Sequence, residues 1–241
     1  MSETNINDIS LFLNSFRLIA NVEDIPDFDS FQNQYTRLKE EFLAIQQEAT
    51  ENALVHATGF NVFSVLGLSR AENRTHSAML ANLLSPYGDH GQQYLFLDKF
   101  INYCQEKYPD FPKPSEDLKT GHWEVIIELP IPPLGRMDIV LRSPDLNYVC
   151  VIENKVDAYE QQEQLIRYGK WLDKQRQFYP DQALFFLTID GHKSITARGL
   201  DYWCLSYHED IAGWLSSTLD DIQAPVVKVI VEQYIDLVKF L

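Results

Sequence analysis

The chain has 241 residues, of which 45% are hydrophobic and 23% charged, a composition typical of a folded globular protein and unlike that of a disordered one. Its formal net charge of -15 argues against tight non-specific binding to DNA. No apolar run approaches the roughly 18 residues that cross a bilayer, and the N-terminal residues lack a basic start followed by an apolar stretch, so we expect a cytoplasmic protein with no membrane partner.

The first predicted elements are helical. Apolar residues at three- and four-residue spacing predict an amphipathic helix over residues 28–54. A short break follows, so we predict an N-terminal helical arm at residues 1–57 and a main domain at residues 58–241. Two further helices are expected over residues 60–85 and 93–108.

Strand signals begin after these helices. Three short runs rich in β-branched and apolar residues, separated by turn signals, predict a three-stranded meander. The predicted strands cover residues 123–131, 136–143 and 147–154, and they are followed by a helix over 156–179, strands over 183–190 and 201–207, and helices near 208–219 and 225–240. This order predicts an α/β domain with a mixed central sheet flanked by helices, and with helical additions at both ends.

The acidic residues gather at the two ends of the chain. Residues 1–60 hold ten acidic and three basic side chains, and residues 201–241 hold seven and two. The middle, residues 61–200, holds eighteen and fifteen, which leaves room for a local basic groove. The acidic ends are compatible with a protein partner or a homo-oligomer. The three cysteines are far apart and form no CxxC pair, so neither a disulfide framework nor a thiolate zinc site is predicted.

The third strand-like run ends in Glu153-Asn154-Lys155. Side chains alternate across a strand, so Glu153 and Lys155 project from one face and Asn154 from the other. The apolar residues before them imply a strand covered on both faces. We therefore expect a carboxylate and an ammonium at the rim of the core; a surface ion pair is the alternative reading.

The preceding strand-like run contributes Asp138. If the turn over residues 143–147 makes the two strands antiparallel neighbours, Asp138 lies beside Glu153 at one end of the sheet. Two close carboxylates resist joint ionisation unless a cation lies between them, and Mg²⁺ prefers such hard oxygen ligands. Lys155 would then orient or help deprotonate the attacking water. A plain strand-edge aspartate is the alternative.

Asp138, followed fifteen positions later by Glu153-Asn154-Lys155, resembles the signature of the PD-(D/E)XK nuclease superfamily. Met137 stands where the name-giving proline would be. Gln164 and Tyr168, four residues apart on the following predicted helix, look like the QxxxY element of several branches. The resemblance implies a restriction-endonuclease-like core. An amphipathic helix that only packs on the sheet is the alternative for Gln164 and Tyr168.

A further part of the resemblance lies upstream. Glu72, His76-Ser77, Leu83-Leu84-Ser85-Pro86 and His90-Gly91 are similar to the opening helix region of an uncharacterised bacterial branch of the superfamily, and the likeness extends over roughly residues 60–240. It implies that Glu72 joins the metal site; a helix-surface charge is the alternative. For His76, a structural or phosphate-contacting role is favoured over zinc binding, because its spacing from His90 fits no common zinc pattern.

The resemblance implies a metal-dependent nuclease that hydrolyses phosphodiester bonds of DNA or RNA, as an effector of bacterial defence. The implied catalytic residues are Asp138, Glu153, Lys155, Gln164 and Tyr168; the implied ligands of Mg²⁺, with Mn²⁺ as a substitute, are Asp138, Glu153 and Glu72; and the implied substrate contacts are His76, Lys170 and Lys174. For the two lysines, a solvated helix face is the alternative. The competing function is a catalytically inactive protein of the same fold that acts as a binding or interaction module.

Overall fold

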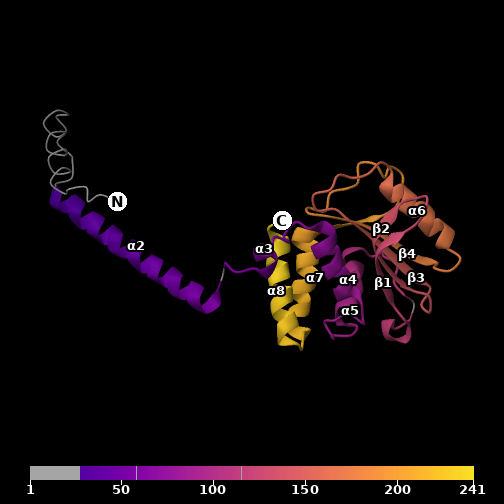
Figure 1. The fold of residues 1–241 in the computed structure, drawn as a ribbon, viewed down its shortest axis with the longest axis horizontal. Helices are drawn as coiled ribbons and strands as arrows, with labels where there is room; N and C mark the ends of the chain where they lie inside the picture. Colours follow the sequence, from indigo (N-terminus) through magenta and orange to yellow (C-terminus); the bar gives the residue numbers. More distant parts are fainter. Residues whose placement is uncertain (1–27, 58, 115) are drawn as a thin grey trace. The chain divides into compact units, whose positions relative to one another are not determined.

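The computed structural model of the chain describes residues 28–57, 59–114 and 116–241 (Figure 1). They divide into two units, one ending at Phe60 and the other running from Asn61 to Leu241. The described α-helices are α2 (Phe28–His56), α3 (Val62–Val65), α4 (Ala78–Leu84), α5 (Leu95–Lys107), α6 (Gln164–Gln175), α7 (Ala212–Thr218) and α8 (Pro225–Lys239). Shorter helical segments are the π-helices η1 (Glu72–Ser77) and η3 (Tyr207–Ile211) and the 3-10 helices η2 (Leu118–Thr120) and η4 (Leu219–Asp221). The strands are β1 (Glu124–Pro130), β2 (Arg136–Ser143), β3 (Tyr148–Asn154), β4 (Asp181–Thr188) and β5 (Trp203–Ser206).

The second unit is built on a five-stranded mixed sheet in the order β1-β2-β3-β4-β5. The first three strands pair antiparallel, which confirms the predicted meander. β3 pairs parallel with β4, and β4 pairs parallel with β5. α6 makes the connection from β3 to β4, as parallel neighbours require a crossover. The mixed α/β core is therefore as predicted.

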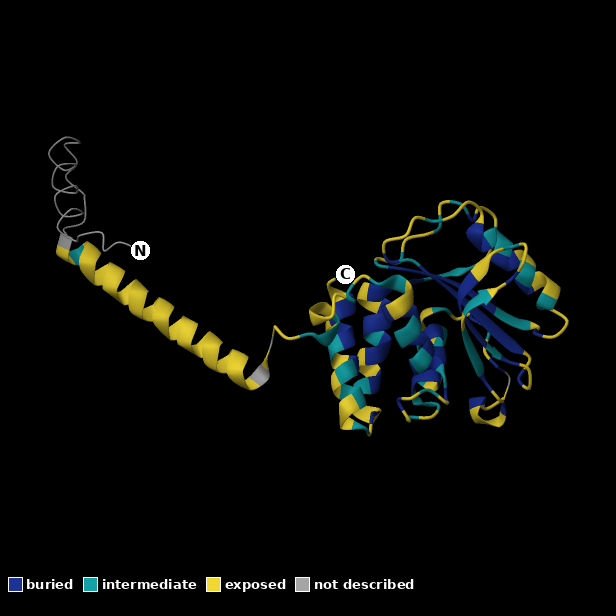
Figure 2. Cartoon of the chain, in the orientation of Figure 1, coloured by how far each residue is buried: buried dark blue, intermediate teal, exposed yellow. Residues whose placement is uncertain are grey.

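Helices cover both faces of the sheet (Figure 1). α4, α5, α7 and α8 pack on the face that carries Ile139 and Ile152, in a large hydrophobic cluster. α6 packs on the opposite face, against a smaller cluster that includes Val140 and Val151. Every residue of β3 is buried, because this strand lies between β2 and β4 and is covered from both sides (Figure 2). The apolar run before Glu153 has the two-sided cover that its composition predicted.

Two predicted helices differ from the observed ones in extent. The helix expected over residues 60–85 is interrupted after α3, where Gly67 has a φ of 67°. The helix expected over residues 156–179 covers only Gln164–Gln175: it begins late because Glu163 has a φ of 52°, and it ends four residues before the predicted end. A residue in the left-handed region cannot continue a right-handed helix, and apolar spacing alone does not reveal such a residue.

The described part of the first unit contains α2, a single helix of 29 residues that confirms the helix predicted there. Its described side chains are exposed along the length of the helix, apart from a half-buried Ser30 (Figure 2). The predicted domain boundary between residues 57 and 58 stays a prediction. Within the described segments, no helix is both long enough and apolar enough to pass through a membrane.

The large hydrophobic cluster should dominate the stability of the second unit. Trp214 on α7 is fully buried there, with its ring centroid 5.0 Å from that of Phe100. We expect Trp214→Ala to lower the free energy of unfolding by about 3–5 kcal/mol, because it leaves a cavity in the core. Phe178→Ala, at an exposed aromatic residue, should change it by less than about 0.5 kcal/mol. Urea unfolding followed by fluorescence or circular dichroism measures both; equal losses would contradict the assignment of the core.

Candidate active site

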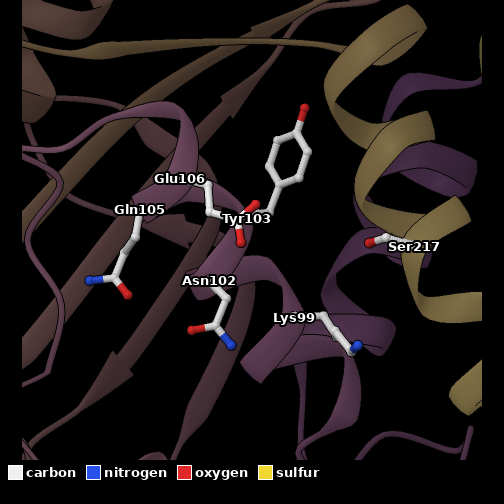
Figure 3. A pocket seen from close by; sticks show the side chains of 6 residues that line it. All are labelled: Lys99, Asn102, Tyr103, Gln105, Glu106 and Ser217. Carbon is white, nitrogen blue, oxygen red and sulfur yellow. The ribbon is translucent and has the colours of Figure 1, made fainter.

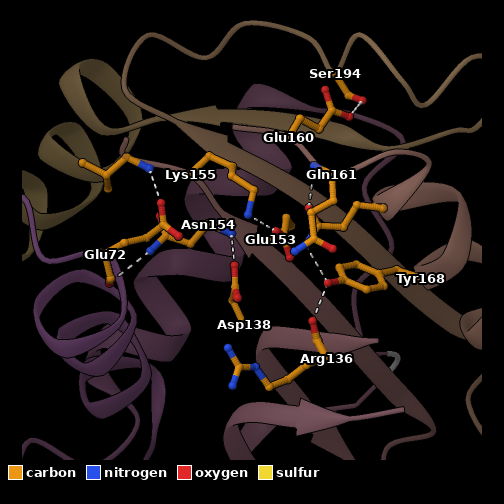
Figure 4. Close-up of polar contacts among 12 residues, drawn as sticks. Glu72, Arg136, Asp138, Glu153, Asn154, Lys155, Glu160, Gln161, Tyr168 and Ser194 are labelled. Carbon is orange, nitrogen blue, oxygen red and sulfur yellow. Dashed lines mark hydrogen bonds and ion pairs between the residues drawn. The ribbon is translucent and has the colours of Figure 1, made fainter. Parts of the chain in front are cut away.

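Two carboxylates meet where β2 and β3 lie side by side (Figure 4). The antiparallel register pairs Ile139 with Ile152, and continuing it by one residue places Asp138 opposite Glu153. Both side chains are turned to the face of the sheet that α6 covers, because they alternate with Ile139 and Ile152. Glu153 is 0% exposed and Asp138 is 7% exposed. Two acidic groups are thus held together in an environment that is nearly closed to water.

Lys155 completes this cluster. Its ammonium forms an ion pair with Oε1 of Glu153, and its side chain is only 10% exposed. The backbone N–H of Lys155 donates to the carbonyl of Leu187, 2.8 Å away, so the chain remains attached to β4 just beyond the end of β3. Because Lys155 follows Glu153 by two residues, the same pleat directs both side chains to one face. The structure therefore brings Asp138, Glu153 and Lys155 together as expected from their positions on the strands.

Burial and mutual repulsion shift the pKa values of these groups. Burial raises the pKa of Glu153 to about 8, and the nearby Asp138 adds to the rise. Burial also raises the pKa of Asp138, against the attraction of Lys155. For Lys155, burial alone would lower the pKa, but the carboxylates of Glu153 and Asp138 outweigh it and hold the pKa above its usual value. At neutral pH the cluster accordingly retains a proton that an exposed glutamate would release.

A divalent cation fits the chemistry of this pair. Both oxygens of Glu153 are buried; Oε1 has the ammonium of Lys155 beside it, whereas Oε2 has no hydrogen-bond donor. A buried carboxylate oxygen without a donor is costly, and a cation between two carboxylates removes that cost. The described residues contain no group of three or more His, Cys, Asp or Glu side chains that could hold a metal ion. Mg²⁺ needs only one or two carboxylates when it keeps several waters, so Asp138 and Glu153 suit it.

Asn154 anchors the site from the other face of the sheet. Its backbone N–H donates to Oδ2 of Asp138 at 2.9 Å and so fixes the orientation of that carboxylate. Its side-chain amide donates to Oγ of Ser77 at 3.0 Å and accepts from the hydroxyl of Tyr207 at 2.7 Å. The alternation of side chains predicted that Asn154 faces away from Glu153. Sequence analysis missed Ser77 and Tyr207 as its partners, because nothing in local spacing joins residues so far apart in the chain.

The side chain of Glu72 lies next to the segment that follows Lys155 and accepts a hydrogen bond there. It begins the π-helix η1, a conformation that is frequent at functional sites. Its Oε2 accepts a hydrogen bond of 2.7 Å from the backbone N–H of Val156, the residue after Lys155 (Figure 4). Glu72 thus holds the chain immediately beyond Lys155. Its role as a metal ligand stays a prediction.

Gln164 and Tyr168 lie on one face of α6, as their spacing predicted, and both are buried. Gln164 Nε2 donates to the hydroxyl of Tyr168 at 2.9 Å, and that hydroxyl donates to the backbone carbonyl of Arg136 (Figure 4). Burial raises the pKa of Tyr168, and the charge of Glu153 raises it further, so the phenol stays protonated. The pair therefore ties α6 to the start of β2, two residues before Asp138.

The three residues predicted to contact substrate lie in different surroundings. His76 is fully buried, and its two ring nitrogens lie 3.0 Å from the hydroxyl of Tyr234 and 2.9 Å from the carbonyl of Ser69. It has no free hydrogen-bonding atom for a phosphate, which favours the structural role over the phosphate-contacting one.

Lys170 and Lys174 are exposed on α6, and no described residue forms an ion pair with either.

An acidic residue that sequence analysis did not single out holds the neighbouring loop. Glu160 accepts hydrogen bonds from the hydroxyls of Ser194 and Thr196 and, at 2.9 Å, from the backbone N–H of Ile195. These bonds lower the pKa of Glu160 against the effect of burial, so it is an anion with its oxygens used. They connect the segment after Lys155 to the loop between β4 and β5. A lone glutamate in a polar stretch carries no signal for such a role.

A surface hollow lies elsewhere in the second unit. It has a volume of about 530 Å³ and is lined by side chains of α5 together with Ser217 of α7 (Figure 3). Lys99, in its wall, pairs with Asp221 at 2.7 Å. None of the clustered carboxylates lines this hollow, so it belongs to a different part of the molecule from the candidate active site.

Comparison with known protein families gives a match for most of the chain. Residues 60–235 match the model of a family described as the PD-(D/E)XK nuclease superfamily. The match spans the whole sheet, Glu72 and the α6 pair. Searches of the curated proteins and of the solved structures gave no match.

The raised pKa of Glu153 should be visible in the stability of the metal-free protein. Between about pH 4.3, where a glutamate titrates in the unfolded chain, and about 8, the folded protein holds a proton that the unfolded chain releases. The free energy of unfolding therefore falls as the pH rises through this window. In EDTA, we expect wild type to lose on the order of 3 kcal/mol more than Glu153→Gln between pH 5 and pH 8. Urea titrations at several pH values measure the difference; the same pH dependence in both proteins would contradict it.

Proposed function

The chain belongs to the PD-(D/E)XK nuclease superfamily, and from this premise we propose that it hydrolyses phosphodiester bonds of DNA or RNA with a divalent metal ion, Mg²⁺ first and Mn²⁺ as a substitute. The family match and the mixed sheet with helices on both faces confirm the predicted restriction-endonuclease-like core. One observation supports the catalytic proposal most strongly. Asp138, Glu153 and Lys155 lie close together, largely shielded from water, at one end of β2 and β3.

In this proposal, Asp138 and Glu153 hold the metal ion. Asp138 is oriented by the N–H of Asn154 on Oδ2, which leaves Oδ1 for the ion. Glu153 would contribute its buried carboxylate, whose Oε2 has no hydrogen-bond donor. A bound Mg²⁺ supplies charge on the scissile phosphate and lowers the pKa of a coordinated water. Glu72, whose Oε2 accepts from the backbone N–H of Val156, is proposed as a third carboxylate that would help to hold the ion.

Lys155 is proposed to act on the attacking water and on the phosphate. Its pKa is held above the usual value, so at neutral pH the side chain is an ammonium with three donors and no acceptor. It can therefore orient the water by donating to it and can offset negative charge on the pentacovalent transition state. Its neighbour Glu153 keeps it at the site in the absence of substrate. Proton removal from the water falls to the carboxylates or to the solvent.

Gln164 and Tyr168 are proposed to support this arrangement rather than to react. Their hydrogen bonds hold the carbonyl of Arg136, and so the segment of β2 that carries Asp138. Lys170 and Lys174 continue along the same helix as exposed cations, and we propose that they contact the phosphate backbone. His76 is assigned a structural role, because its ring is buried and its nitrogens are engaged.

The net charge of -15 is the observation that favours the second candidate function, a catalytically inactive member that binds a protein. Three buried ionisable groups in one place count against it, since their desolvation is costly without a use. The family resemblance also supports a role as a cytoplasmic effector of bacterial defence, and we include that role in the proposal. The negative net charge would then favour substrates that the enzyme contacts over a short stretch near the active site.

Cleavage assays test the catalytic proposal directly. We expect digestion of at least one of four substrates, single- and double-stranded DNA and RNA, in Mg²⁺ or Mn²⁺ and none in EDTA. Asp138→Ala and Lys155→Ala should each lower the rate at least about 100-fold, because each removes a group that acts on the developing charge.

The matched control for Lys155→Ala is Lys239→Ala, which removes an exposed lysine at the end of α8 and should cleave as wild type does. Thermal unfolding of all variants should stay within a few degrees of wild type, so that lost activity is not lost folding. Equal cleavage by wild type and Lys155→Ala would refute the proposed chemistry. Absence of cleavage under all these conditions would favour the inactive binding module.

The two exposed lysines of α6 yield a separate prediction about substrate binding. The double variant Lys170→Ala/Lys174→Ala should raise KM with little change in kcat, because it removes ground-state contacts to phosphate. The salt dependence of binding should weaken by a slope of roughly one per lysine. Lys113→Ala/Lys239→Ala, at two exposed lysines outside α6, is the control of equal charge. A KM that is the same in both double variants would show that Lys170 and Lys174 lie only on a solvated face.

A further inference from the structure

The helix α2 exposes an apolar seam that the proposed nuclease chemistry does not use. Among its 29 residues, no described side chain is buried. Five large apolar side chains follow one another along the helix with 44% to 66% of their surface exposed. They are Phe31, Tyr35, Leu38, Phe42 and Ile45. An apolar surface of this extent on a water-exposed helix indicates a binding partner.

The spacing of these five residues identifies the geometry of that partner. Their steps are four, three, four and three residues, and Ala49 continues the series four residues after Ile45. These residues can be assigned to the a and d positions of a heptad. A narrow stripe at a and d positions suits a second helix packed alongside the first, whereas a helix lying on a sheet needs a broader stripe. The stripe therefore suits another helix as its occupant.

The charges beside the seam favour a second copy of this chain in parallel orientation. With Leu38 at a d position, Glu41 and Glu48 fall at g positions, while Lys39 and Gln46 fall at e positions. In a parallel pair, each g position meets the next e position of the partner, so Glu41 faces a glutamine and not a like charge. In an antiparallel pair g meets g, which brings glutamates together. Identical helices are thus compatible in one orientation.

The exposed apolar surface of α2 approaches the size of a dimer interface. Large apolar and aromatic side chains bury roughly 150–250 Å² each, so five of them at the observed exposure, from two helices, remove on the order of 1,000 Å² from water. This approaches the size of the smaller specific interfaces, about 1,200 Å², before the stems of the flanking polar residues are added. Most helical stability in proteins comes from packing of an amphipathic face, and pairing would supply that packing to α2.

We propose that two copies of this chain associate through α2 as a parallel two-stranded coiled coil, with Phe31, Tyr35, Leu38, Phe42 and Ile45 in the seam. The association is independent of the metal chemistry at Asp138 and Glu153. Each assembly then carries two copies of the sheet domain.

Mass measurement of the full chain tests the association. Size-exclusion chromatography with light scattering, at tens of micromolar protein, should give twice the 28.0 kDa mass of one chain. Leu38→Glu/Phe42→Glu should halve that mass, because it buries four like charges in the seam of a dimer. The control Asn33→Glu/Thr36→Glu adds the same charge on the outer side of α2 and should leave the mass unchanged.

Disulfide trapping tests the orientation. Ala49→Cys places a thiol at an a position, where the two copies of a residue meet in a parallel pair, and should give a cross-linked dimer under mild oxidation. Asn33→Cys, on the outer side, should not. A monomer in wild type, or a dimer that survives Leu38→Glu/Phe42→Glu, would overturn the proposal. A dimer that Ala49→Cys fails to cross-link would overturn its parallel orientation, whatever the outcome of the cleavage assays.

Discussion

The candidate active site depends on the antiparallel register between β2 and β3. That register sets Asp138 against Glu153, and the backbone N–H of Asn154 then holds Oδ2 of Asp138 at 2.9 Å. This hydrogen bond from the main chain of β3 to a side chain of β2 joins the two strands and orients a carboxylate at the same time. The positions of Lys155, the α6 pair and Glu72 are all defined relative to these two strand ends. Loss of the register would separate every proposed participant.

The two faces of the sheet near Asp138 and Glu153 have different roles. One face carries the proposed catalytic groups, and the other holds the backbone in place. Glu153 and Lys155 face α6, where burial raises the pKa of the carboxylate. Asn154 faces the larger hydrophobic cluster, where it bonds to Ser77 and Tyr207 from the two π-helices. A satisfied polar network in a low-dielectric interior is rigid, and it fixes the residue that stands between the two functional ones. Glu153 and Lys155 are therefore positioned by hydrogen bonds on the opposite face of the sheet.

Sequence reasoning predicted the central parts of this arrangement because they follow from short-range patterns. Alternation on β3 placed Glu153 and Lys155 together, and one turn signal placed Asp138 beside them. The start of α6 was wrong because a single left-handed residue, Glu163, carries no mark in the hydrophobic pattern. The partners of Asn154 were missed because they come from segments 77 and 53 residues away, brought together only by tertiary packing. Long-range polar contacts are the part that a single sequence leaves undetermined.

The turn between β2 and β3 limits which insertions and deletions the protein can tolerate. It spans four residues and closes with a hydrogen bond of 3.2 Å from the N–H of Asn147 to the carbonyl of Pro144, Asn147 having a φ of 54°. Inserting one residue into β3 would send Glu153 to the opposite side of the sheet, because strand side chains have a period of two. Point substitutions in this turn should be tolerated far better than any change of length. Insertions and deletions would therefore accumulate in the other loops of the domain and spare this hairpin.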